Sequence, residues 1–213
     1  PKNINQIRFQ VGLVFQYPEY QLFEETVYKD IAFGPTNMGL SQREIDSRVI
    51  KAAEMVDLSD NLLQKSPFDL SGGEKRRAAI AGVMAMQPKV IVLDEPTAGL
   101  DPAGRDVILS RIKQYRDATG STVIIVSHSM EDMAKTAERI LVMNKGKVEM
   151  FDTVGNVFSH AELLESIGLN IPQVTQIALR LKDFGFNVDN NIYTVEQMKN
   201  SLLKLMGRGQ KNA

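Results

Sequence analysis

The middle of the chain alternates short, wholly apolar runs with an amphipathic helical segment, and this pattern constrains the fold most strongly. Val90–Leu93 and Thr122–Val126 are two such runs, and their length suits strands buried on both faces. Residues 103–118 between them predict a helix, because apolar residues recur at helical spacing and Gly120 supplies a C-cap. The apolar face of that helix consists of Ile108, Ile112 and Tyr115. Strands that alternate with helices favour an α/β fold with a mostly parallel sheet and right-handed crossovers.

The rest of the chain carries further signals of the same kind. Residues 7–15 alternate and then become wholly apolar, which predicts a strand. Ser41 and Glu44 have the spacing of a capping box in front of a helix. The other expected elements are a helix at residues 75–86, a helix capped by Ser129 that runs to residue 138, and a hairpin with strands at residues 140–143 and 148–151.

The pattern changes along the chain, and this change predicts two domains and a tail. Residues 1–151 are expected to form the α/β domain, with a helical subdomain at about 35–88. Residues 152–206 contain amphipathic helices and are expected to form a small helical extension. The apolar stripes of that extension either pack on each other or share in a dimer contact. Residues 207–213 are expected to be a disordered tail.

Composition narrows the classes of protein to consider. The chain of 213 residues has 25 basic and 26 acidic side chains, so its charge gives no argument for binding nucleic acid. It contains no cysteine, so disulfides and thiolate metal sites are excluded. No run of about 18 apolar residues is present, and no signal peptide is visible.

Two acids, Asp94 and Glu95, directly follow the first apolar run. Open α/β sheets bind ligands at the carboxyl ends of their strands, so these side chains stand where chemistry is usually done. The aspartate suits Mg²⁺, and the glutamate suits a general base that activates water. The alternative is a pair of solvated acids at a strand end.

Three other polar residues stand at similar places. His128 follows the second apolar run and could bond a terminal phosphate or an attacking water, although a lone histidine is commonly structural. Gln16 follows the first expected strand and could reach a metal ion or a water, or it is simply a polar loop residue. Asp101 lies in "AGLDP", where turn formation alone explains it.

The stretch "LSGGEKRR" has two explanations. Ser71 and Glu74 have the spacing of a second capping box. Alternatively, Gly72 and Gly73 let a ligand approach a helix N-terminus, which offers backbone N–H groups to a phosphate. Both explanations use the same backbone groups, so the stretch by itself does not decide between them.

In their order along the chain, these segments resemble the nucleotide-binding subunit of ABC transporters, over residues from about 11 to 151. The resemblance implies a P-loop NTPase-like, mostly parallel sheet with a helical signature subdomain and a small C-terminal helical extension. Residues 1–151 are then a partial ABC ATPase domain that uses ATP and Mg²⁺. The matching residues are Gln16 in the Q-loop, Ser71, Gly72, Gly73 and Glu74 in the signature motif, Asp94 and Glu95 in Walker B, Asp101 in the D-loop and His128 as the switch histidine.

The resemblance also implies roles for these residues. Two subunits would enclose two ATP molecules, so that the signature motif of one subunit meets the γ-phosphate held by the other. Glu95 would activate the attacking water, with His128 near the γ-phosphate. Asp94 and Gln16 would lie near Mg²⁺.

The segment "FQYPEYQLFEETVYKDIAFGPTNMG" narrows the resemblance to the cobalt-type and energy-coupling factor transporter ATPases. That family energises the uptake of vitamins or of cobalt or nickel ions at the cytoplasmic face of the bacterial membrane. Its implied partners are a second ATPase subunit, identical or paralogous, a membrane scaffold protein and a substrate-binding membrane protein. The loop 17–23 either docks a helix of the scaffold or packs the helical subdomain.

The sequence departs from the family in two respects. It contains no G-x-x-x-x-G-K-[ST] motif, which the family places upstream of the Q-loop. We therefore expect this sequence alone to bind ATP poorly, and its unpaired sheet edges to favour association. Glu74 stands where glutamine is commoner in the signature motif.

Two other classes of protein were weighed against this resemblance. A non-catalytic binding module remains an alternative for this sequence. ABC proteins of DNA repair are set aside, because the roughly 50 residues between Gln16 and Leu70 leave no room for a long coiled coil.

Overall fold

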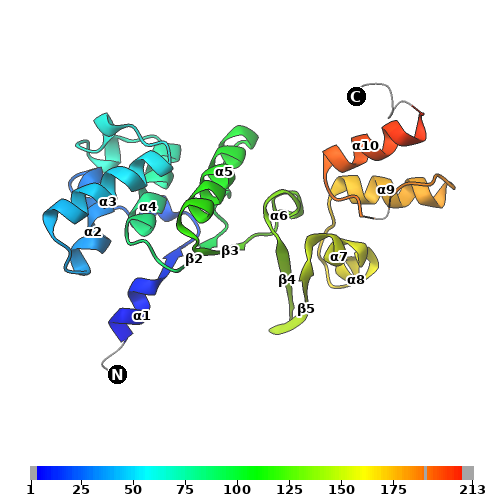
Figure 1. Cartoon of the computed structure of the whole chain (residues 1–213), viewed down its shortest axis with the longest axis horizontal. Coiled ribbons are helices and arrows are strands. Elements are labelled where there is room, and N and C mark those ends of the chain that lie inside the picture. The colour runs from blue at the N-terminus through cyan, green and yellow to red at the C-terminus, as the bar shows by residue number, and fades with distance from the viewer. Residues whose placement is uncertain (1–3, 190, 208–213) are drawn as a thin grey trace. The chain divides into compact units, whose positions relative to one another are not determined.

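The computed structural model describes residues 4–189 and 191–207, with the side chains of residues 5 and 6 left aside. The chain divides into two compact units, Pro1–Val126 and Ser127–Ala213 (Figure 1). This division falls at residue 126, and the expected domain boundary at residue 151 stays a prediction.

The first unit contains a small parallel sheet and a group of helices (Figure 1). Its strands are β1 (Val11–Val14), β2 (Val90–Asp94) and β3 (Thr122–Val126). Its α-helices are α1 (Ile4–Gln10), α2 (Val27–Asn37), α3 (Gln42–Met55), α4 (Gly72–Ala85) and α5 (Pro102–Thr119). Short 3₁₀ turns are η1 (Pro18–Gln21), η2 (Asp60–Leu62) and η3 (Pro67–Asp69).

Strand β2 lies between β1 and β3, and all three strands run parallel. Leu93 of β2 pairs with Val14 on one side and with Ile125 on the other. The expected parallel α/β sheet is confirmed, with α5 as the connection from β2 to β3. Asp101 caps α5 and Gly120 ends it in the left-handed conformation, as the sequence predicted for Gly120.

The two faces of this sheet differ in burial. One face, which carries Ile91 and Leu93, packs into the core formed with α4 and α5. The other face carries Leu13 and Ile124, which are 43% and 46% exposed. The expectation that residues 122–126 form a buried strand is therefore wrong, because β3 is an edge of the described sheet and has one covered face.

The expected strand at residues 7–15 is also wrong in its first half. Residues 4–10 form helix α1, and the strand is confined to Val11–Val14. The pairing explains the boundary, since Val11 is opposite Val90, where β2 begins. The neighbouring chain before Val90 is not a strand: Gln87 has a φ of +53° and Pro88 lacks an N–H group.

Two glycines of the first unit, one on strand β1 and one on helix α2, lie very close to α4 or to the residue that follows it. A Cβ at Gly12 of β1 would lie 2.5 Å from Val83 Cγ1 on α4. A Cβ at Gly34 of α2 would lie 2.5 Å from Met86 Cγ, just after α4. Packing against Val83 therefore requires glycine at position 12, whereas a side chain at position 34 would require Met86 to move. The capping box at Ser41 and Glu44 is present and opens α3, as expected.

The second unit consists of a hairpin and small helices (Figure 1). Strands β4 (Arg139–Asn144) and β5 (Lys147–Thr153) pair antiparallel, as the sequence predicted. Helix α6 (Met130–Thr136) is capped by Ser129, and it ends two residues before the expected end. The remaining helices are α7 (Val154–Ser159), α8 (Ala161–Ser166), α9 (Gln173–Asp183) and α10 (Val195–Leu205).

The apolar stripes of α9 and α10 meet in a small core that contains Ala178 and Met198. The expected mutual packing is therefore present. Phe184 and Val195 remain exposed at 79% and 71%, so the alternative of a dimer contact stays a prediction. The expected tail at residues 207–213 lies outside the described residues except for Gly207.

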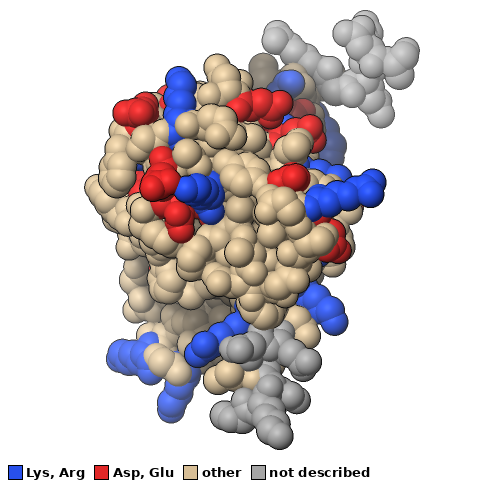
Figure 2. All heavy atoms as spheres, turned by 90° about the vertical axis from the view of Figure 1, so that its left-hand side faces the viewer, with Lys and Arg blue, Asp and Glu red and all other residues tan. Residues whose placement is uncertain are grey.

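Charged side chains are unevenly spread over one side of the first unit. Figure 2 views the molecule from the side of α2 and α3, where acidic and basic side chains gather in places and a wide area has neither. Among the described residues, every helix is too short or too polar to cross a membrane.

Candidate functional site

The carboxyl ends of β1 and β2 meet at one edge of the sheet. Val14 ends β1 and pairs with Leu93, while Asp94 ends β2 and pairs with Val126. Gln16 follows two residues after Val14 and is exposed. The structure therefore places Gln16 and Asp94 at the same edge, where open α/β sheets bind ligands.

Glu95 leaves this edge through a strained turn. Its backbone N–H donates to the carbonyl of Val126 at 2.9 Å, which continues the pairing of β2 with β3 by one residue. Its φ is +47°, a left-handed value that is uncommon for residues other than glycine. The Glu95 carbonyl accepts from Ala98 N–H at 3.1 Å, which closes the turn. Strain of this kind persists where surrounding contacts fix it, and it is concentrated at functional sites.

The end of β1 has a related geometry. Tyr17 has a φ of +56° and is followed by Pro18, where η1 begins. Glu95 is likewise followed by a proline, Pro96. Both neighbouring strands therefore turn sharply beyond the shared edge and leave Gln16 and Glu95 in loops, while Asp94 is the last residue of β2.

The N-terminus of α4 carries the expected capping box. Ser71 N–H donates to Glu74 Oε2 at 2.8 Å, and Glu74 N–H donates to Ser71 Oγ at 3.4 Å. The Ser71 hydroxyl also donates to Glu74 Oε2 at 2.6 Å. These bonds lower the pKa of Glu74 below its usual value of 4.5, the hydroxyl bond being the largest cause. The helix begins at Gly72, three residues before the expected start, because the cap stands at Ser71.

Nothing in the described fold requires glycine at positions 72 and 73. A Cβ at Gly72 would meet no atom within 4 Å, and one at Gly73 would meet only Arg77 Nη1 at 3.8 Å. Neither residue has a positive φ. Among the described residues, no hydrogen bond engages the backbone N–H groups of Gly72 and Gly73. The open space beside Gly72 and Gly73, together with their backbone N–H groups, favours close approach of an anionic ligand to this helix end.

Asp101 has a structural task in this chain. Its Oδ1 accepts from Gly104 N–H at 2.9 Å, so it is the N-cap of α5. The capping explains the residue type without a ligand, and the D-loop role of Asp101 stays a prediction.

His128 belongs to the second unit and is exposed. It stands two residues after the end of β3. Its neighbours form a local turn, in which Ser129 N–H donates to Ser127 Oγ at 3.0 Å. The role of His128 as the switch histidine stays a prediction.

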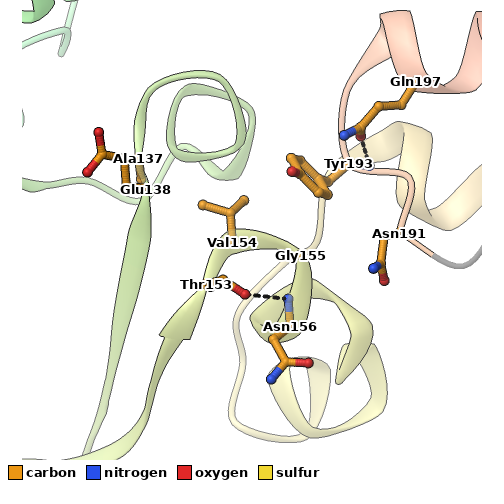
Figure 3. A pocket seen from close by; sticks show the side chains of 9 residues that line it. All are labelled: Ala137, Glu138, Thr153, Val154, Gly155, Asn156, Asn191, Tyr193 and Gln197. Atoms are coloured by element: carbon orange, nitrogen blue, oxygen red, sulfur yellow. Dashed lines mark hydrogen bonds between the residues drawn. The ribbon is translucent and has the colours of Figure 1, made fainter.

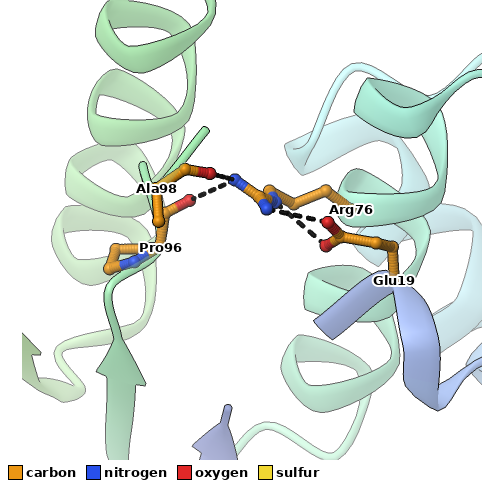
Figure 4. Close-up of polar contacts among 4 residues, drawn as sticks. All are labelled: Glu19, Arg76, Pro96 and Ala98. Atoms are coloured by element: carbon orange, nitrogen blue, oxygen red, sulfur yellow. Dashed lines mark hydrogen bonds and ion pairs between the residues drawn. The ribbon is translucent and has the colours of Figure 1, made fainter. Parts of the chain in front are cut away.

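Arg76, which no sequence motif singled out, is 3% exposed and joins three segments of the first unit (Figure 4). Its Nε and Nη2 donate to the carboxylate of Glu19 in η1 at 3.1 and 2.8 Å. Its Nη1 donates to the carbonyl of Ala98 and, at 3.5 Å, to that of Pro96. No pattern in the sequence links Arg76 to Glu19, which lies 57 residues away, so only the fold could reveal this contact.

A hollow of about 500 Å³ lies within the second unit (Figure 3). Polar bonds shape its wall, where Tyr193 N–H donates to Gln197 Oε1 at 2.9 Å and Asn156 N–H donates to Thr153 Oγ1 at 3.4 Å. None of the predicted site residues lines it. Within residues 4–189 and 191–207, no group of three or more His, Cys, Asp or Glu side chains could hold a metal ion.

Comparisons with known proteins place these features in context. A family model described as "ABC transporter" matches residues 1–98. The energy-coupling factor transporter ATP-binding protein EcfA2 of Caldanaerobacter subterraneus is 54% identical over 210 residues, which cover 99% of this chain and 73% of that protein. EcfA2 of Clostridium perfringens is 55% identical over 204 residues, covering 95% of this chain and 72% of that protein.

Solved structures agree with these sequence relatives. One is CbiO1 of Clostridium perfringens, described as part of the ABC transporter complex CbiONQ, which is 38% identical with a TM-score of 0.69. The match covers 83% of this chain and 70% of CbiO1. Another is the dimeric ATP-binding cassette MJ0796 bound to ADP and phosphate, 27% identical with a TM-score of 0.62, over 72% of this chain and 67% of that one.

The glycine geometry predicts opposite effects on stability at two places. Gly72→Ala or Gly73→Ala should leave the free energy of unfolding unchanged or raise it by up to about 1 kcal/mol, because alanine favours the helix and its Cβ clashes with no neighbour. Gly12→Ala should lower it by about 1–3 kcal/mol through overpacking against Val83. Denaturant unfolding measures all three. A large loss at Gly72 or Gly73 would contradict the claim that the fold does not need these glycines.

The capping box predicts the titration of Glu74. Its pKa in the folded chain should lie below 4.5, and Ser71→Ala should move it back toward that value because the hydroxyl bond is lost. The stabilising contribution is then complete above pH 4.5 and is lost as the pH falls through the folded pKa. Carboxyl carbon NMR titration measures both values, and Glu44, in the capping box of α3, is a matched reference in the same spectra. Equal Glu74 values in the two chains would contradict the assignment.

Proposed function

This chain belongs to the energy-coupling factor transporter ATP-binding proteins of the ABC transporter family, and from this membership we propose that Glu95 activates water for ATP hydrolysis that energises solute uptake. The observation that supports this role is the strained turn that presents Glu95 beside Asp94 at the carboxyl edge of the sheet. A carboxylate held at that edge suits a general base.

The described residues fit part of a site for ATP with Mg²⁺. When bound, the nucleotide with its cation supplies a phosphoryl group open to attack by water. We propose that the half-buried Asp94, helped by Gln16, holds Mg²⁺, a cation often bound through few carboxylates and substrate phosphates. The phosphate loop and its lysine are not among these 213 residues.

The N-terminus of α4 fits the terminal phosphate of a nucleotide held by a second ATPase subunit, identical or paralogous. The open space at Gly72 and Gly73 and their N–H groups support this proposal. Ser71 and Glu74 maintain the helix end through the capping box. Under this proposal, one set of residues serves helix stability within the subunit and phosphate binding across the dimer.

We assign His128 and Asp101 to the same reaction by the family resemblance. His128 would bond the γ-phosphate or the attacking water, and Asp101 would lie in the loop that faces the partner subunit. Asp101 meanwhile caps α5, so its replacement would affect both helix stability and any contact between subunits.

The proposed setting is an importer of vitamins or of cobalt or nickel ions, at the cytoplasmic face of a bacterial membrane. A membrane scaffold protein and a substrate-binding membrane protein complete the assembly. The solute is selected by the latter, so no residue of this chain is assigned to solute binding.

The loop at η1 supplies a docking surface for a helix of the scaffold. Tyr20 and Phe23 are 85% and 60% exposed, so most of their surface faces solvent, whereas Leu22 packs against the core of the first unit. Phe23 stacks edge-on against Phe33 at 5.0 Å, and its N–H donates to Asp30 at 3.1 Å. The aromatic side chains are therefore held in place while they face solvent, which favours an apolar helix as the partner.

The general-base role predicts the effect of Glu95→Gln. In the intact protein assembled with its partners, turnover of ATP should fall by about 10²–10⁴, while nucleotide affinity stays within a few fold. Phosphate release and binding of a fluorescent nucleotide measure the two quantities. Glu54→Gln, at an exposed position on α3, is the control and should leave both unchanged. Turnover near the wild-type value in Glu95→Gln would remove the assignment.

The docking surface predicts the effect of Tyr20→Asp. A carboxylate at this exposed position should prevent co-purification of the scaffold, while the melting temperature stays unchanged because the side chain contributes little to the core. Val107→Asp, on an exposed position of α5, is the matched control. Normal recovery of the scaffold with Tyr20→Asp would show that η1 is not the docking surface.

A further inference from the structure

Arg76 connects helix α4, which is capped by Ser71, with the turn that follows Glu95. The two carbonyl groups that it contacts belong to Pro96 and Ala98, one on each side of Thr97. Thr97 is itself 4% exposed, so this turn is enclosed by protein. A planar guanidinium offers donors in a fixed arrangement, and it therefore fixes the positions of these carbonyl groups.

Glu19 fixes the guanidinium in turn. The carboxylate accepts two parallel bonds from Nε and Nη2, and this pairing sets the plane of the arginine as well as its position. The ring of Tyr17 lies 5.9 Å from the guanidinium carbon. Arg76 is thus held by the residues that follow β1, while it holds the residues that follow β2 (Figure 4).

The turn after Glu95 depends on hydrogen bonds that fix its backbone, such as those from Arg76. Glu95 adopts a left-handed conformation that is unfavourable for its residue type, and the backbone bonds of the turn include those of Ala98 N–H to Glu95 and of Leu100 N–H to Thr97. The contacts from Arg76 reach the same turn from a different helix. They restrict the carbonyl groups at positions 96 and 98, which lie one and three residues beyond Glu95.

We propose that Arg76, oriented by Glu19, is a positioning residue that holds the turn of residues 95–98 and thereby aims the Glu95 carboxylate. The proposal rests on the proposed role of Glu95 in ATP hydrolysis. Arg76 acts through the turn and touches neither nucleotide nor water. Its effect therefore falls on turnover more than on nucleotide binding.

The first test is the kinetics of Arg76→Lys in the intact protein assembled with its partners. Lysine keeps the charge, but its single ammonium group cannot reproduce the two-sided contact with Glu19 and the carbonyl groups. The expected result is a fall in kcat of about tenfold or more, with KM for ATP changed less than about threefold, since misplacement of a catalytic group lowers the chemical step.

Arg48→Lys is the matched control. Arg48 also donates from a guanidinium to a backbone carbonyl, that of Met86 at 3.1 Å, just past the opposite end of α4. It contacts neither η1 nor the turn after Glu95 in the bonds of the described residues. Its replacement should leave kcat and KM at wild-type values.

The second test needs no activity. Hydrogen exchange without nucleotide should show faster exchange at the amides of Ala98 and Leu100 in Arg76→Lys, because both close the turn. The amide of Gly120, which bonds to Arg116 at the far end of α5, should be unchanged. Glu19→Gln keeps the shape of the side chain that holds Arg76 and removes its charge, so it should produce the same changes to a smaller degree. It also replaces Arg76→Lys if the Arg76→Lys chain does not fold.

Wild-type kcat together with wild-type exchange at Ala98 and Leu100 in Arg76→Lys would overturn the proposal. Failure of the proposed function gives a different result, namely that Glu95→Gln retains turnover. In that case the exchange experiment still decides whether Arg76 holds the turn. A fall in kcat with faster exchange in Arg76→Lys, and neither in Arg48→Lys, supports the proposal.

Discussion

Strand β2 is hydrogen-bonded on both sides, and the positions of Gln16, Asp94 and Glu95 at the candidate site follow from that pairing. Leu93 and Ile91 are fully buried, so a shift of register by one residue would move both side chains to the opposite face of the sheet. The register in turn fixes where the strand ends. Because Asp94 pairs with Val126 and Leu93 pairs with Val14, the register alone brings the acids and Gln16 to a common edge.

The glycines separate what the fold needs from what a ligand needs. At Gly12 the neighbouring Val83 leaves no room for a Cβ, so packing alone explains the residue type. At Gly72 and Gly73 the space is open and the backbone is ordinary, and glycine there costs helix stability. A glycine that lowers helix stability and that packing does not require is explained by a ligand from outside the subunit. A phosphate at the helix N-terminus is such a ligand.

Elements with strong local signals were predictable from the sequence. The capping boxes at Ser41 and Ser71 and the C-cap at Gly120 are confirmed, because they depend on residues a few positions apart. Features that depend on distant partners were not predictable. The apolar pattern continues before Val11, yet strand β1 begins only there, because the chain before its neighbour β2 contains Pro88 and does not form a strand. The exposure of β3 depends on which elements cover the sheet.

The ion pair of Arg76 with Glu19 illustrates why the most informative contact left no trace in the sequence. Burial of two charges is costly, and a pair of apolar residues of similar volume often serves stability as well. The pair is therefore better explained by the groups that it positions than by a gain in stability, since apolar side chains cannot bind the carbonyl groups of Pro96 and Ala98. Glu19 precedes the exposed Tyr20 in η1, so the same guanidinium links the proposed docking surface to the turn that carries Glu95. A displacement of η1 by a docked helix would reach that turn through the Arg76 side chain.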